Sequence, residues 1–331
     1  MGDQYYIRPG PEGTSLEPSF AWGEPPPLPW YKRLPQRWTN SLAFHAVLFL
    51  LTCVSTLIVG THIALNYEQS FPAFDWDISR AFFASIYHDP TMLTLGIPFS
   101  FTLLSILLAH ELGHYFTCRY YGIEATYPYF IPAPTLIGTM GAFIRIKSPI
   151  TTRRALFDVG ISGPLAGFMV AIPALIVATL NCQPLVPRGL PDTITLGNPL
   201  AITLLARLLR PGVHPASISL HPVGCAAWVG LFATALNLLP MGQLDGGHIL
   251  YAVFGERHKT VSRGLFLALL PLGVFCWAGW VVWAVVLLVV GLRHPKVMIP
   301  SEPIDTIRKT LAVAAMLIFL LTFVPTPFAI R

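Results

Sequence analysis

An uncharged apolar run that leads directly into a His-Glu-x-x-His motif constrains this chain more than any other feature. The run extends from Thr91 to Ala109, long enough to cross a bilayer as one helix, and residues 110–114 are HELGH. On a helix, His110 and His114 occupy positions i and i+4, so both imidazoles lie on one side and can hold one metal ion. Ionisable side chains inside a membrane cost free energy and mark functional sites. The sequence therefore predicts a metal site within a membrane helix.

The composition is that of a membrane protein. Hydrophobic residues make up 54% of the 331 residues and charged residues 11%, whereas a soluble domain has about 25% charged residues. We therefore predict an all-α polytopic membrane protein with six or seven transmembrane helices, embedded in the lipid bilayer. The formal net charge of +5 is modest, and the basic residues flank apolar runs. That placement indicates membrane topology and no nucleic-acid partner.

The apolar runs and their flanking charges together predict the topology. Residues 1–38 are rich in proline, so we expect a disordered tail, followed by a membrane domain over 39–331. The tail ends in a basic stretch, which places it on the cytoplasmic side of what we expect to be a bacterial cytoplasmic membrane. Residues 265–292 are long for one tilted helix and short for two, so a single helix and a hairpin both stay open. The other membrane spans are predicted at 42–65, 92–117 and 155–180, from about 223, and at 310–327, with the loop 181–221 outside.

The segment after the second predicted span has a different pattern. Residues 121–150 are rich in proline, glycine, tyrosine and phenylalanine, and over 142–147 two isoleucines alternate with two basic residues. A period of two indicates a strand whose isoleucines face the apolar interior. We predict a small membrane-associated β-hairpin or sheet here, with an edge that can capture an extended substrate.

A catalytic zinc takes three protein ligands and keeps one position open, and the His-Glu-x-x-His motif supplies two of the ligands. Acidic residues are rare among the apolar runs, which leaves Asp158 and Asp245 as candidates for the third. Asp158 follows two arginines at the start of a span, where an interfacial or capping carboxylate is expected. Asp245 lies beyond Pro240 and Gly242, which should break its helix, and it could cap a new one. Its depth at the cytoplasmic end of its span matches that of the two histidines, so Asp245 is preferred.

The two motifs together resemble a known family. HELGH in one helix and NLLPMGQLDGGH at 237–248 are similar to the HExxH and N-x-x-P-x-x-x-LDG signatures of the site-2 protease family of intramembrane zinc metalloproteases. The resemblance implies a zinc metalloendopeptidase that hydrolyses a peptide bond in or near a transmembrane segment of a single-span or other membrane-protein substrate. It implies Glu111 as general base and Asn237 as a residue that places the substrate or stabilises the intermediate. It also implies one Zn²⁺ per chain, held by His110, His114 and Asp245.

The resemblance covers a core of three helices, here about residues 92–256, and the chain is similar to the compact members that lack PDZ and CBS domains. Gly242 stands where the common PxPxLDG form has its second proline, so the local backbone path is expected to differ. Some zinc transporters also place HExxH-like residues in a membrane helix, and a membrane metal-ion transporter is therefore the alternative function. Transporters usually line a path with polar groups from several helices, and such groups are few in this sequence.

Overall fold

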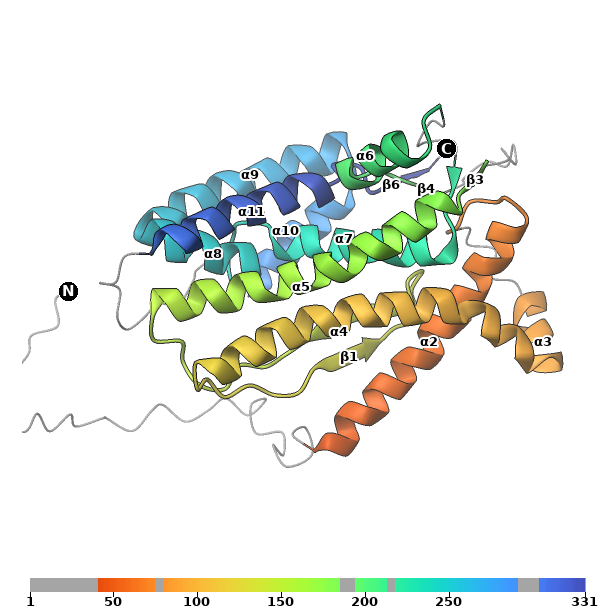
Figure 1. Cartoon of the computed structure of the whole chain (residues 1–331), viewed down its shortest axis with the longest axis horizontal. Coiled ribbons are helices and arrows are strands. Elements are labelled where there is room, and N and C mark those ends of the chain that lie inside the picture. Colours follow the sequence, from red (N-terminus) through yellow and green to blue (C-terminus); the bar gives the residue numbers. More distant parts are fainter. Residues whose placement is uncertain (1–40, 75–79, 185–193, 213–217, 291–303, 331) are drawn as a thin grey trace, which may run out of the picture. The chain divides into compact units, whose positions relative to one another are not determined.

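The computed structural model describes residues 41–74, 80–184, 194–212, 218–290 and 304–330 (Figure 1). The predicted N-terminal tail, residues 1–38, lies outside these ranges. Within them the chain is mostly helical, with three small two-stranded antiparallel sheets. This confirms the predicted helical class with a minor β component.

Three helices of the described part are long and apolar enough to cross a membrane, and each falls on a predicted span. They are α2 (Leu42–Glu68), the continuous helix Pro90–Tyr120, and α5 (Arg153–Leu180). The second of these begins as a 3-10 helix, η2 (Pro90–Gly96), and continues as α4 (Ile97–Tyr120). A short helix, α3 (Arg80–His88), precedes it. The His-Glu-x-x-His motif is therefore carried by a helix that can span a bilayer.

The predicted helix break near Pro240 separates two helices. α7 (Pro222–Asn237) ends before it, and α8 (Asp245–Phe254) begins after it. Gly242 has a φ of +59°, in the left-handed region that favours glycine, so the chain can turn between the helices. The expected capping role of Asp245 is wrong: Leu244 is the N-cap residue, and Asp245 is the first residue of α8. The Asp245 carboxylate faces two histidines instead of the helix end.

The C-terminal half settles the choice left open for residues 265–292 in favour of a hairpin. α9 (His258–Phe275) follows the 3-10 helix η4 (Gly255–Arg257), and α10 (Gly279–Val290) packs back against α9. The last predicted span corresponds to α11 (Thr306–Thr322), which begins and ends a few residues earlier than expected. α7, α10 and α11 have 16, 12 and 17 residues, fewer than the roughly 20 that a bilayer requires. The total of six or seven crossings therefore stays a prediction.

A β-hairpin follows α4, as predicted, but its strand lies earlier than expected. β1 (Tyr129–Pro132) pairs antiparallel with β2 (Thr139–Phe143), with Tyr129 opposite Phe143. Beyond Phe143 the pairing is reduced to one isolated bridge between Ala125 and Ile146. There the Arg145 N–H donates to the Thr126 hydroxyl at 2.9 Å, whereas the Thr126 N–H donates to the Arg145 carbonyl at 3.0 Å. The expected alternation is confirmed: Ile144 and Ile146 are half-buried, whereas Arg145 and Lys147 are exposed.

The predicted outer loop, 181–221, contributes to the two remaining sheets. β3 (Gln183–Pro184) pairs with β5 (Ile218–Ser219), and β4 (Ile194–Leu196) pairs with β6 (Phe328–Ile330) near the C-terminus. Between β4 and β5 lies α6 (Leu200–Leu209). Ala201 and Ile202 of α6 join a hydrophobic cluster with residues of α4 and α7. The described part of this loop therefore covers one end of the helices.

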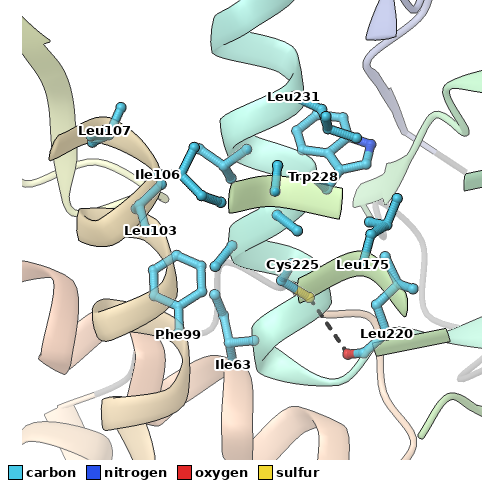
Figure 2. Packing of buried hydrophobic residues seen from close by; sticks show 14 of the residues in the cluster. Ile63, Phe99, Leu103, Ile106, Leu107, Leu175, Leu220, Cys225, Trp228 and Leu231 are labelled. Carbon is cyan, nitrogen blue, oxygen red and sulfur yellow. Dashed lines mark hydrogen bonds between the residues drawn. The ribbon is translucent and has the colours of Figure 1, made fainter. Parts of the chain in front are cut away.

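Packing between α4 and α7 fixes the helices that carry the two motifs. Phe99 and Ile106 of α4 are at most 1% exposed and lie in one cluster with Trp228 and Leu231 of α7 (Figure 2). A Cβ on Gly230 would lie 2.7 Å from Ile106 Cγ2, so glycine permits this close approach. Small residues at membrane helix contacts act in this way because van der Waals packing drives their association. The contact places the His-Glu-x-x-His turn of α4 beside the end of α7.

Candidate active site

The sequence forms the centre of the site on one helix. His110, Glu111 and His114 lie on consecutive turns of α4 and are 5%, 6% and 7% exposed. The two imidazoles point in the same direction, with their Nε2 atoms 3.1 Å apart. Three polar side chains are thus buried within a helix that can span a membrane.

Asp245 completes a group of three metal-ligating side chains. Its Oδ2 lies 3.2 Å from His110 Nε2 and 3.3 Å from His114 Nε2. Tetrahedral zinc with bonds of about 2.0–2.1 Å separates its ligand atoms by roughly 3.3 Å, so these spacings fit a zinc ion. Among the described residues this is the one group of three or more His, Cys, Asp or Glu that the structure brings together for a metal. The donor set of two imidazoles and one carboxylate is typical of catalytic zinc.

The orientation of His114 is fixed from the other side of its ring. His114 Nδ1 lies 2.7 Å from the carbonyl oxygen of Val159 in α5. Because a carbonyl only accepts, Nδ1 carries the proton and Nε2 keeps a free lone pair toward Asp245 and His110. Such hydrogen bonds orient metal-binding histidines in proteins. A backbone carbonyl of α5 therefore holds the His114 ring with its Nε2 toward His110 and Asp245.

Small residues of α5 allow this helix to approach the ligands. A Cβ on Gly163 would lie 2.1 Å from His114 Nε2, and a Cβ on Gly113 would lie 2.5 Å from the carbonyl oxygen of Ser162. α4 and α5 run side by side along this contact (Figure 1). The glycine at 163 therefore allows the His114 ring to lie beside His110 and Asp245.

We expect Gly163→Ala to weaken zinc binding by at least about tenfold, the lower end of the effect of losing a group that orients a ligand. The added methyl can be accommodated only if the His114 ring moves away from its present position. Zinc affinity of the purified protein, measured by competition with a chelating dye, checks this. Gly167→Ala is the matched control on α5, because its Cβ would come no closer than 3.3 Å to His110. Equal affinities of the two variants would contradict the prediction.

Asn237 and Glu111 lie beside the three ligands. Asn237 is the last residue of α7, and its Nδ2 lies 3.3 Å from His110 Nε2. The Glu111 carboxylate is in hydrogen-bonding contact with the backbone N–H of Ile144, just after β2. The structure thus brings all five predicted site residues together, from α4, α7 and α8. Sequence reasoning missed the contributions of Val159 and Ile144, because backbone groups carry no signal in the residue type.

Asp158, the second candidate for the third ligand, is engaged elsewhere. Its Oδ1 accepts a hydrogen bond from Arg308 Nε at 2.8 Å, and its Oδ2 accepts one from the Tyr121 hydroxyl at 2.5 Å. It is not part of the group with the two histidines. The cap of α5 is Thr152, so Asp158 does not cap this helix, and its expected place at the membrane interface stays a prediction.

Comparison with known proteins agrees with the site. Residues 98–277 match the model of peptidase family M50, a range that contains both motifs. Over 294 residues the chain is 29% identical to the probable zinc metalloprotease EGY1, chloroplastic, of Arabidopsis thaliana, covering 84% of this chain and 52% of that protein. Over 271 residues it is 30% identical to the probable zinc metalloprotease EGY2, chloroplastic, of the same plant, covering 80% and 47%. The chain spans about half the length of these relatives. Because the family model covers more than half of the chain together with both motifs, the chain belongs to peptidase family M50.

Proposed function

We propose that this protein is an intramembrane zinc-dependent endopeptidase. The observation that carries the proposal is the spacing of His110, His114 and Asp245, which fits one tetrahedral zinc beside the buried Glu111. The helix with the histidines is apolar and long enough to cross a membrane. The names of the plant relatives support a zinc-dependent protease. We propose one Zn²⁺ per chain and a catalytic core over about 92–256.

The roles of the side chains follow from their positions. When bound, zinc supplies Lewis-acid activation of water and of the scissile carbonyl. Glu111 accepts a proton from the attacking water and later donates it to the leaving amine. The Asn237 amide, which already reaches His110, donates a hydrogen bond to the developing oxyanion or to the substrate. The burial of His110, Glu111 and His114 limits the access of bulk water to the reacting groups.

Cleavage of a purified single-span reporter tests the proposal. We expect a chelator to abolish hydrolysis of the reporter in detergent and added zinc to restore it. A metal-ion transporter, the alternative function, would instead move zinc across vesicle membranes without cutting the reporter. Among the described residues one three-ligand group is present, and no second group extends a path across the helices. Zinc flux without cleavage would overturn the protease assignment.

The substrates we propose are transmembrane proteins, single-span or other, that bind in extended form. A transmembrane helix hides its carbonyls in hydrogen bonds, so the scissile segment must unwind before attack. β2 is suited to hold it, because one side of β2 pairs with β1 and the chain after β2 contacts Glu111 through Ile144. A strand added along β2 would therefore lie close to the general base.

A photo-crosslinking residue at Met140 should capture the substrate, because this side chain of β2 is 74% exposed. Met169 of α5 is the matched control, since it is 65% exposed but belongs to another element. Crosslinked product on a gel, with cleavage blocked by Glu111→Gln, gives the measurement. Equal capture at both methionines would contradict a docking role for β2.

We propose that the protein crosses the membrane six or seven times, with the N-terminal tail in the cytoplasm of a bacterial cell. The basic residues before α2 and in the last turn of α4 support this orientation. Cysteines introduced at Ser15 and Ser217, in a background without the native cysteines, should be labelled by an impermeant reagent from opposite sides. Labelling of both from one side would contradict the predicted number of crossings between them.

A further inference from the structure

Arg308 joins the ends of three helices. It lies in the first turn of α11, and its Nε donates to Asp158 Oδ1 of α5 at 2.8 Å, while a second guanidinium nitrogen contacts Asp158 Oδ2. The same guanidinium donates to the hydroxyl of Tyr121, the C-cap residue of α4, at 3.2 Å, and contacts Asp305. A planar fork of this kind holds a carboxylate in one geometry, which a lysine cannot do.

A cation at this position needs an explanation beyond membrane topology. The first turn of a helix disfavours positive charge, because the exposed N–H groups carry partial positive charge there. A topology signal requires only a solvated cation, as the neighbouring exposed Lys309 provides. The Arg308 side chain is instead only 19% exposed. It contacts the Asp158 side chain, which is 22% exposed. The arginine is therefore placed for its contacts with α4 and α5.

Tyr121 completes the network as a fixed donor. Its hydroxyl donates to Asp158 Oδ2 at 2.5 Å. Burial, together with the neighbouring Asp158 carboxylate, raises the pKa of Tyr121 above its ordinary value, so the hydroxyl keeps its proton. Arg308, Asp158 and Tyr121 thus form a closed triangle that connects the end of α4 to the start of α5.

The triangle of Arg308, Asp158 and Tyr121 lies next to the backbone carbonyl that orients His114, a proposed zinc ligand. Asp158 directly precedes Val159, whose carbonyl accepts the hydrogen bond from His114 Nδ1. Tyr121 follows His114 by two helical turns on α4. A slide or rotation of α5 against α4 would therefore move the Val159 carbonyl away from His114.

α11 is also packed against the helix that carries the third ligand. Leu156 and Phe157 of α5, Ile249 of α8, and Ala315 and Ile318 of α11 belong to one buried cluster. Asp245 begins α8, so α11 packs against the same helix that carries the third proposed ligand. α11 lies outside the part of the chain that matches the family model, which ends at residue 277.

We propose that Arg308 is a positioning residue of the metal site. By clamping Asp158 and Tyr121, it fixes α5 against the end of α4 and keeps the Val159 carbonyl on His114 Nδ1. The inference rests on the proposed zinc site and extends it to a helix outside the family core.

Zinc affinity and the thermal stability of the metal-free protein, measured on the same full-length preparations, test the proposal. Arg308→Ala should weaken zinc binding about 10- to 100-fold, as loss of a ligand-orienting partner does. Arg308→Lys keeps the charge without the fork and should fall between this variant and wild type. Lys309→Ala is the matched control and should bind zinc as wild type does. Asp158→Asn combined with Arg308→Ala should bind zinc no more weakly than the worse single variant, because both act through one contact.

The outcomes separate three cases. If Arg308→Ala and Arg308→Lys lower the melting temperature of the metal-free protein but leave zinc affinity unchanged, Arg308 is only structural and the inference is overturned. Additive losses in the double variant would overturn the shared mechanism as well. His110→Ala belongs to the same series: zinc binding as tight as wild type in that variant would overturn the metal site itself, and the inference with it.

Discussion

Glu111→Gln should bind zinc as wild type does and lose peptide-bond cleavage by about 10²- to 10⁴-fold, the range for removal of a general base. The substitution keeps the size and shape of the side chain, and Glu111 is not one of the three grouped ligands. The amide cannot accept the proton of the attacking water. Zinc content and reporter hydrolysis are to be measured on the same preparation.

Glu124→Gln is the matched control for this variant. Glu124 is an exposed carboxylate beyond the end of α4, so its neutralisation should leave both zinc content and cleavage unchanged. Turnover by Glu111→Gln close to that of the control would exclude Glu111 as the general base. Loss of zinc from Glu111→Gln would show that it supports the metal group instead.

Asp245→Ala should weaken zinc binding by more than the roughly 10- to 100-fold that loss of a ligand-orienting group costs, and cleavage should fall with it. The carboxylate is the one ligand that lies outside α4, and its Oδ2 is within 3.3 Å of both histidine Nε2 atoms. Two imidazoles alone leave the ion with too few protein ligands for a catalytic site. His110→Ala should have a comparable effect, since it removes another of the three.

Glu256→Ala is the matched control for Asp245→Ala, because Glu256 is an acidic residue that follows α8. This residue forms an exposed pair with Lys259, so its loss should not affect zinc. If Asp245→Ala binds zinc as tightly as Glu256→Ala and still cleaves, the third ligand lies elsewhere. Asp158 would then be the next candidate, although it is paired with Arg308 in this structure.

The grouping of these side chains could be predicted because each of them carries a local signal in the sequence. The i, i+4 spacing of His110 and His114 defines a shared helix face, and the break around Pro240 marks the segment that delivers Asp245. The structure places these groups together from α4 and α8. The glycines of α5 were also visible in the sequence, although their contact with His114 was not. What remained hidden were the Val159 carbonyl and the Ile144 N–H, since any residue type can supply a backbone group.

The fold could be predicted where the period or the length of an apolar run determines the element. It could not be predicted where tertiary contacts determine it. The three long spans follow from apolar runs of sufficient length. The α9–α10 hairpin could not be derived from the sequence, because its apolar stretch has a length between that of one helix and that of two. Its turn is set by tertiary contacts, such as the hydrogen bond from Trp280 Nε1 to the Pro325 carbonyl at 2.7 Å. In the hairpin, β2 ends before Arg145, whose N–H donates to the Thr126 hydroxyl and not to a backbone carbonyl, and the residue types alone do not predict this contact.

The distribution of the ligands over α4 and α8 sets an order of events during synthesis of the chain. His110 and His114 enter the membrane early, but Asp245 is added only after α5 and α7 have been made. Until then the growing chain has two of its three zinc ligands, and the Gly163 surface that seats His114 is itself made only with α5. The proposed zinc site is therefore incomplete until the chain has been made as far as α8.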